Sequence, residues 1–260
     1  MTYEPKLRYK IFGIECGNFS PSLQTKEQFL TQTEKAKKLL GESVNAIFAP
    51  SVAFTNKLVE FGQNNDIFAP WLIRTKSKAD AGMVEKSEIA IGFFNADCPI
   101  VCLQQDVRLV AIHGGYRCLI REDRNEAGIL ENAMQGFNPV KTKVFIFGGI
   151  GPCCWEPESD KPEIKNPRLC RYPELLVKCL KKTTRSPLGK NLPSVDLYLL
   201  TRLLLLKCGV SPKKISWNSR CTCCSCVQEN GEPAYWSHTR FLAKGQNGID
   251  GRNFTAVWIE

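Results

Sequence analysis

The chain has 260 residues, of which 43% are hydrophobic and 23% charged, proportions typical of one ordinary globular unit. This apolar content excludes a disordered chain, and no stretch approaches the roughly eighteen uncharged apolar residues of a membrane-spanning helix. The net charge of +9 favours anionic partners such as phosphates or nucleotides. The charge is diffuse, without a basic arm or an RNA-binding signature, so neither nucleic acid nor a membrane is an expected partner.

The first predicted elements are a strand and a capped helix. Residues 7–14 alternate weakly between apolar and polar and predict an entry strand. Thr25 is placed to cap a helix, with Gln28 at the capping-box position. A leucine pair followed by Gly41 ends that helix, which is predicted over residues 26–40.

Short apolar segments then predict a sheet, interrupted by loops and helices. Strands are expected at residues 46–54, 57–61, 89–94, 100–103, 107–112 and 143–147. A tight turn at residues 104–106 joins two of them. The polar residues 62–80 predict a long loop or insertion, and residues 156–168 and 183–194 predict two further loops. Helices are expected near residues 124–136, 172–182 and 195–208, the last closed by Gly209.

This order of elements predicts a single mixed α+β domain over residues 1–260, with a mixed β-sheet core flanked by helices. The strands and helices do not alternate as regular βαβ units. The chain contains no GxGxxG and no GxxxxGK[ST], so a dinucleotide-binding or P-loop site has no support.

The chain has thirteen cysteines, and their expected state depends on the cellular compartment. Residues 1–6 lack an apolar signal-peptide core and a small-residue cleavage site. Without a secretion signal, the cysteines are expected to be free thiols or metal ligands rather than a disulfide framework, and the protein is expected to be cytoplasmic. Because their number is odd, at least one thiol stays unpaired.

The candidate reactive site lies at the ends of two predicted strands. Histidine occurs only at His113 and His238. Cys98 precedes one strand and His113 ends the next, so the hairpin turn at residues 104–106 can return both side chains to one edge of the sheet. A thiolate with an imidazole binds zinc, and it equally forms a nucleophile–base pair. The glycines at residues 114–115 leave backbone that a ligand or another chain can approach, which favours a functional site over a buried cysteine and a hydrogen-bonded histidine.

These motifs resemble those of one family. Residues 95–99 (NADCP) and 111–117 (AIHGGYR) are similar to the ADC and HAGWRG motifs of the YfiH-like laccase-domain family, also called the multicopper polyphenol oxidase or purine nucleoside phosphorylase family. Further stretches agree in order: residues 148–156 (GGIGPCCWE), 195–197 (VDL), 220–224 (RCTCC), 236–240 (WSHTR) and 250–252 (DGR). The resemblance covers nearly the whole chain and implies a YfiH-like α+β architecture.

The resemblance implies a mononuclear zinc held by a His-Cys-His set. It also implies phosphorolysis of purine nucleosides (adenosine, inosine, guanosine and methylthioadenosine), with adenosine deamination beside it. The partners are then a purine nucleoside and phosphate. Cys98 matches the family's cysteine ligand and His113 its second histidine. In such a site the zinc or its bound water activates the attacking group.

Three positions depart from the family pattern. Ala53, which cannot bind metal, stands where the family has its first histidine. Glu15 stands where the family has an arginine suited to an anion, and Thr239 replaces one arginine of the family's SHRR motif. A catalytic zinc takes three protein ligands, so a third would have to come from Glu15, a nearby cysteine or His238.

Further residues near these motifs are candidates for catalysis or substrate binding. Asp97 either orients His113 or acts as a base, or it caps the turn before Cys98, and the sequence favours neither interpretation. Tyr116 and Trp236 are placed to stack a purine, although packing in a core is the commoner role of an aromatic ring. The candidates for substrate binding are Arg117, Tyr116, Arg252 and His238.

Two other functions remain open. One is a thiol amidohydrolase that uses Cys98 and His113, because the family's fold is shared with toxin deamidases that use such a pair. The other is a catalytically degenerate member that kept the scaffold and lost the site. Copper oxidase chemistry is disfavoured because a laccase needs many histidines and this chain has two.

A second group of cysteines also suggests metal binding. Residues 221–226 hold four cysteines, but their spacing is not the paired C-x2-C of a zinc ribbon, so structural or adventitious binding is favoured over a dedicated cluster. Cys153 and Cys154 are adjacent, and neighbouring side chains of a strand point in opposite directions. At most one of them is therefore expected to face the site.

Overall fold

Two six-stranded sheets form the centre of the molecule in a computed structural model that describes residues 5–63, 65–121, 123, 125–155, 172–182, 193–224, 230–246 and 248–260. The first sheet has the order β1 (Leu7–Phe12), β14 (Asn253–Ile259), β7 (Ile89–Asn95), β2 (Ala46–Ser51), β5 (Leu72–Lys78) and β4 (Asn65–Ala69). The second has the order β13 (Ile215–Trp217), β10 (Lys143–Phe147), β8 (Ile100–Gln105), β9 (Arg108–His113), β6 (Ala81–Val84) and β3 (Leu58–Glu60). Each sheet mixes parallel and antiparallel pairs.

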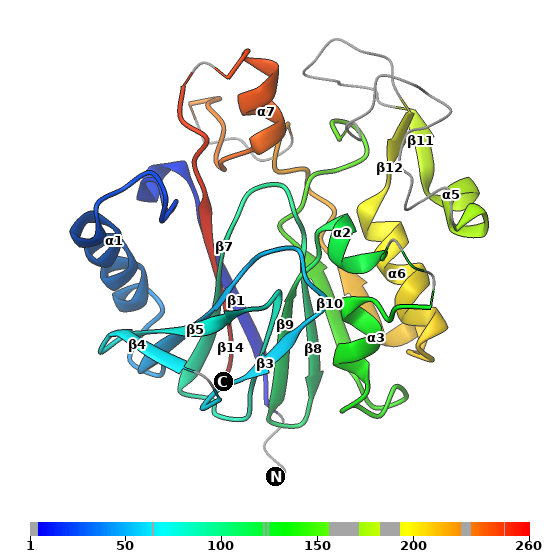
Figure 1. Cartoon of the computed structure of the whole chain (residues 1–260), viewed down its shortest axis with the longest axis horizontal. Coiled ribbons are helices and arrows are strands. Elements are labelled where there is room, and N and C mark those ends of the chain that lie inside the picture. Colours follow the sequence, from blue (N-terminus) through cyan, green and yellow to red (C-terminus); the bar gives the residue numbers. More distant parts are fainter. Residues whose placement is uncertain are drawn as a thin grey trace.

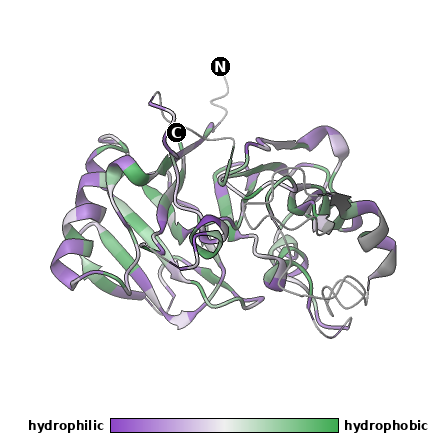
Figure 2. Ribbon diagram, turned by 90° about the horizontal axis from the view of Figure 1, so that it is seen from above, coloured by the Kyte–Doolittle hydropathy of each residue, from purple (hydrophilic) through white to green (hydrophobic). Residues whose placement is uncertain are grey.

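The sheets and helices stack as layers around three apolar cores. The core between the sheets includes Phe48, Phe93 and Leu109, which come from β2, β7 and β9. The outer face of the first sheet packs on α1 (Lys26–Lys38), with Phe29 in its core, and Figure 1 shows this helix on one side of the sheets. In Figure 2 the hydrophobic colouring follows the strands of both layers.

The other helices cover the outer face of the second sheet or lie beyond its end. They are α2 (Tyr116–Leu119), α3 (Ile129–Met134), α5 (Pro173–Cys179), α6 (Leu197–Lys207) and α7 (His238–Ala243). The described residues also form the short 3-10 helices Ile14–Cys16 and Pro212–Lys214, and a small hairpin of β11 (Leu180–Lys182) and β12 (Pro193–Val195). No helix among the described residues is long and apolar enough to cross a membrane.

The predicted α+β class and most predicted elements are confirmed. The Thr25 side chain accepts from the Gln28 amide and the Gln28 side chain accepts from the Thr25 amide, so the predicted capping box starts α1. Helix α6 is followed by Gly209, whose φ of +85° suits a residue without a side chain. The loop predicted at residues 156–168 lies outside the described residues.

The prediction of a loop at residues 62–80 is wrong. Residues 65–78 form β4 and β5, and β5 pairs in parallel with β2. The error arose because β4, the edge strand, and its neighbour β5 bury few side chains, so their sequence is polar. The helix predicted over residues 124–136 is also too long, because α3 begins only at Ile129, where Glu131 caps the backbone of Gly128.

The loops that carry the candidate site residues lie at one end of the two packed sheets, which together form a β-sandwich. Loops after β7, β9, β10 and β13 leave the sheets at the end where α7 lies, at the top of Figure 1. The chain ends lie at the opposite end, because β1 and β14 pair with Leu7 opposite Ile259.

Candidate functional site

Cys98 and His113 meet at this end of the second sheet. β8 and β9 pair antiparallel with Ile100 opposite His113, so the hairpin brings the segment containing Cys98 beside the end of β9. The Sγ of Cys98 and the Cε1 of His113 each lie 3.3 Å from the point where a Cβ on Gly115 would stand. The thiol of Cys98 therefore faces the imidazole of His113. The structure thus brings together the two residues that the hairpin predicted to meet.

Asp80 fixes the orientation of His113. It follows β5 and is fully buried, and its Oδ1 lies 2.9 Å from His113 Nδ1. Its Oδ2 accepts from the amides of Ala53 and Thr55, at 3.2 and 2.6 Å, and from the Thr55 hydroxyl at 3.0 Å. Because Nδ1 is held by Asp80, Nε2 is the ring nitrogen that remains for other partners.

A second thiol, Cys118, contacts the same imidazole. It lies in α2 and is buried, and its sulfur lies within 4.8 Å of a ring nitrogen of His113. Burial opposes a charge on the His113 ring, but the facing Cys98 and hydrogen bonds with Asp80, Cys118 and Cys98 raise the pKa of His113 well above its ordinary value. Burial also raises the pKa of the Cys118 thiol to about 11. A metal ion must displace protons from such donors, so its affinity is expected to rise with pH.

These contacts provide donors that fit a zinc ion. Asp80, His113 and Cys118 offer donor atoms within 4.8 Å of one another, and Cys98 contacts the same ring. Asp80 is already bonded to Nδ1, which is the usual place of a carboxylate that orients a metal-bound histidine. Cys98 does not belong to that group, so a zinc set of two thiolates and one imidazole from Cys98, His113 and Cys118 would require the Cys98 sulfur to move closer.

The sequence analysis missed Asp80 and did not single out Cys118. Asp80 lies in the segment interpreted as a loop, yet Ala79 and Ala81 flank it and an apolar stretch follows. A single carboxylate among small and apolar residues is a sign of a buried charge that needs a partner. Cys118 follows His113 by five residues, within reach of a short helix that starts after a turn.

The loop after β2 packs against the imidazole of His113. The amide of Ala53, the residue at the family's first histidine position, binds Asp80, so this position does lie at the site although it carries no ligand atom. The next residue, Phe54, packs edge-on against His113 with ring centroids 5.4 Å apart. The guanidinium of Arg117 lies 5.8 Å from the centroid of the Phe54 ring.

Asp97 makes its contacts away from His113. Its carboxylate accepts from the Thr222 hydroxyl at 2.9 Å, from the Ser237 hydroxyl at 3.0 Å and from the Thr239 amide at 2.8 Å. The orienting position that the sequence analysis considered for Asp97 is occupied by Asp80. Asp97 instead joins three loops behind the reactive pair.

The substrate-binding candidates separate into two groups. Tyr116 and Arg117 follow His113 directly, and the Tyr116 ring lies 5.5 Å from the ring of Trp155. His238 and Arg252 instead share a carboxylate, since His238 Nδ1 lies 3.1 Å and Arg252 Nη1 2.6 Å from Asp250 Oδ1.

Trp236 packs its ring against the backbone of this chain. Its indole nitrogen donates to the carbonyl of Gly17. A Cβ on Gly251 would stand 2.3 Å from the Trp236 ring, so the glycine backbone packs against that ring. The packing role that the sequence analysis weighed against purine stacking fits these contacts.

Gly114 and Gly115 serve different purposes. The amide of Gly114 donates to the Pro99 carbonyl at 2.7 Å, and a Cβ there would stand 2.9 Å from the same oxygen, so the approaching backbone belongs to this chain. Gly115 has φ −62° and ψ 142°, a conformation open to any residue, and its missing side chain leaves space between Cys98 and His113.

We expect Gly115→Ala to disturb this space without unfolding the protein. The new methyl group would lie 3.2 Å from Phe54 Cε1 and 3.3 Å from Cys98 Sγ, so the thiol and the ring must shift by a few tenths of an ångström. The alkylation rate of Cys98, followed by mass spectrometry, should change by about 10-fold because positioning is sensitive to such shifts. Gly136→Ala is the control, since its Cβ meets only Arg108 Nη1, at 3.7 Å. Equal rates in both variants would contradict the proposed spacing.

The comparisons with known proteins agree with this fold and these motifs. Residues 22–260 match the family model described as multi-copper polyphenol oxidoreductase laccase. The chain belongs to this laccase-domain family. No curated protein matches the chain.

Solved structures show the same fold. The YfiH hypothetical protein of Bacillus licheniformis is 17% identical, with a TM-score of 0.68 over 94% of this chain and 85% of that one. A Neisseria meningitidis protein of family DUF152 is also 17% identical, with a TM-score of 0.68 over 100% and 96%. YlmD from Geobacillus stearothermophilus is 16% identical, with a TM-score of 0.67 over 98% and 92%.

Proposed function

We propose that this protein is a zinc-dependent enzyme that cleaves purine nucleosides with phosphate, at a centre formed by Cys98, His113 and Cys118. The observation that carries the proposal is the buried imidazole of His113, which Asp80 fixes at Nδ1 and which two thiols contact. Cys118 would take the place of the histidine that the family has at the position of Ala53. The site would then keep the three protein ligands of a catalytic zinc.

The zinc ion would act as a Lewis acid and lower the pKa of a bound water molecule. The chain's own residues would orient the zinc ligands and bind the substrate. Asp80 holds the ring at Nδ1, which leaves Nε2 for a ligand. Tyr116 and Trp155 offer aromatic rings next to the centre for a purine.

A phosphate needs a cation near the centre. Arg117 lies above the rings of Phe54 and Tyr116, in both cases 5.8 Å from the ring centroid, and we assign it the anion-binding role. Glu15 is exposed in the 3-10 helix Ile14–Cys16 and carries the charge opposite to the family's arginine. Arg117 would therefore have to supply the charge that Glu15 cannot, and adenosine deamination, which needs water rather than phosphate, is a related activity to measure.

The test is base release from adenosine, inosine, guanosine and methylthioadenosine, with and without inorganic phosphate, by protein whose zinc and copper contents are measured. We expect phosphate-dependent release that falls by roughly 10²-fold or more in His113→Ala. Zinc bound per chain should fall in Cys98→Ser and Cys118→Ser. Cys208→Ser changes a half-buried thiol at the end of α6 and should behave as the wild type. Release that survives both chelation and His113→Ala would refute the proposal.

One observation favours a second candidate, a thiol amidohydrolase. Cys98, His113 and Asp80 are linked in the order nucleophile, base and orienting carboxylate. The metal-free protein would then hydrolyse an amide with Cys98 as nucleophile. Amidase activity that survives chelation but is lost after alkylation of Cys98 would favour this candidate over the zinc enzyme.

A further inference from the structure

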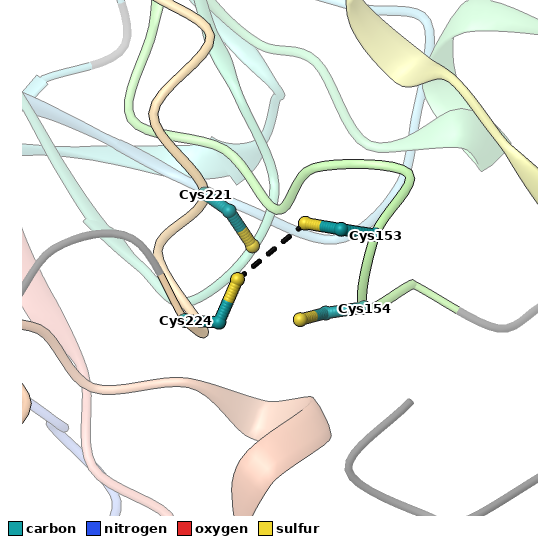
Figure 3. Close-up of side chains that lie close together, drawn as sticks. All are labelled: Cys153, Cys154, Cys221 and Cys224. Atoms are coloured by element: carbon teal, nitrogen blue, oxygen red, sulfur yellow. Dashed lines mark hydrogen bonds between the residues drawn. The ribbon is translucent and has the colours of Figure 1, made fainter. Parts of the chain in front are cut away.

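Four thiols meet at a second place at the same end of the sandwich. They are Cys153, Cys154, Cys221 and Cys224, which we call the four-cysteine cluster (Figure 3). All four sulfurs lie within 4.8 Å of one another, and the Sγ atoms of Cys153 and Cys224 are 3.5 Å apart. The prediction that at most one of Cys153 and Cys154 faces the site rested on strand alternation. These residues lie in a turn, where that alternation does not apply, and both reach the four-cysteine cluster, which is a different place from the Cys98–His113 site of that prediction.

The sheet topology explains why two distant segments meet here. β10 and β13 are parallel neighbours, so the loops that follow them leave the sheet side by side. One loop carries Cys153 and Cys154, and the other carries Cys221 and Cys224. The amide of Thr222 donates to the carbonyl of Gly149, which fixes the two loops relative to each other.

The space between the sulfurs is kept open by a glycine. A Cβ on Gly151 would stand 3.2 Å from the Sγ of Cys153 and 3.6 Å from that of Cys221.

We propose that the four-cysteine cluster binds a structural zinc ion through its four thiolates. A tetrahedral zinc with Zn–S bonds of about 2.3 Å places its sulfurs about 3.8 Å apart, and the four sulfurs need only small movements to reach this. Four protein ligands leave no open position, which distinguishes this site from the catalytic kind. Soft thiolates select zinc over magnesium or calcium.

This zinc would stabilise the loops that lie behind the reactive centre. Thr222 lies between the two ligands of its loop, and its hydroxyl binds Asp97, the residue before Cys98. Arg240 of α7 donates to the carbonyl of Cys223, so α7 is attached to the same loop. The ion would therefore hold together the loops after β7, β10 and β13.

The test compares zinc bound per chain in protein purified with a thiol reductant and without chelator. Cys153→Ser/Cys224→Ser should lose one zinc equivalent relative to the wild type. Cys98→Ser, which changes the other centre, should leave the four-cysteine cluster loaded, and Cys208→Ser should change nothing. With Co²⁺ in place of zinc, the wild type and Cys98→Ser should show sulfur-to-cobalt charge-transfer absorption that is much weaker in the double variant.

A second measurement needs no variant and covers the case in which the double variant does not fold. Thiols of native wild type are alkylated with and without added zinc, and the modified peptides are mapped. Zinc should protect all four cysteines of the cluster, whereas Cys208 should react equally in both samples. Unchanged zinc content in the double variant with no protection, or disulfides between cluster cysteines in place of zinc, would overturn the proposal.

Discussion

Asp80→Asn is expected to reduce the zinc affinity of the proposed catalytic centre, or its activity, by about 10- to 100-fold. The amide cannot accept all the hydrogen bonds that the carboxylate accepts from His113 and from Thr55, so the imidazole loses its fixed orientation. Removing one charge of a buried pair also destabilises the fold, by about 3–5 kcal/mol. Urea denaturation and zinc titration of the same samples separate the two effects.

The matched control is Asp250→Asn. Asp250 also binds a histidine, His238, but the His238 side chain is 43% exposed, so the pair is partly screened by solvent. We expect a much smaller loss of stability and unchanged zinc affinity. If Asp80→Asn leaves zinc affinity, activity and stability at wild-type values, Asp80 does not orient His113.

The same carboxylate gives stability a defined pH dependence. Burial raises the pKa of Asp80, but the hydrogen bond and charge of His113 and the amides of Thr55 and Ala53 outweigh burial and lower it below the ordinary 3.8. The contribution of Asp80 is therefore present above pH 3.8 and is lost as the pH falls through the folded-state pKa. Asp80→Asn should lack this acid-dependent part of the unfolding free energy.

Asp97→Asn is expected to destabilise the protein by about 1.5–3 kcal/mol. The carboxylate is buried and accepts three hydrogen bonds from the loops at Thr222, Ser237 and Thr239, and an amide nitrogen at one position would face a donor. Asp97 has φ +69°, which asparagine tolerates, so the substitution tests the hydrogen bonds rather than the backbone.

The readouts for Asp97 distinguish a structural role from a catalytic one. Chemical denaturation should show the loss of stability, while activity per folded molecule falls much less than in His113→Ala. Wild-type stability together with a large loss of activity would show instead that Asp97 transfers protons, the role that the sequence analysis considered.

The contact between Cys98 and His113 could be predicted because it follows from local rules. A short turn between two apolar strands forces an antiparallel pair, and the residues that flank the pair then share one edge of the sheet. The helices α1 and α6 were predictable for the same reason, since capping residues and a following glycine act within a few residues.

Asp80 could not be found in this way, because its role depends on the pairing of two strands that are not neighbours in the sequence. β5 and β6 flank it, and only the pairing of β6 with β9 places Asp80 beside His113. The polar composition of β5, which lies next to the edge strand β4, hid this arrangement. The four-cysteine cluster depends in the same way on the parallel pairing of β10 with β13, which joins residues far apart in the sequence.

The most direct test of the reactive centre is a crystal structure of the zinc-loaded protein, with anomalous scattering measured at the zinc edge. The account predicts an anomalous peak bonded to the sulfurs of Cys98 and Cys118 and to Nε2 of His113, with Asp80 still bound to Nδ1. A fully loaded crystal with no peak at these three residues would contradict it, whatever is bound at the four-cysteine cluster.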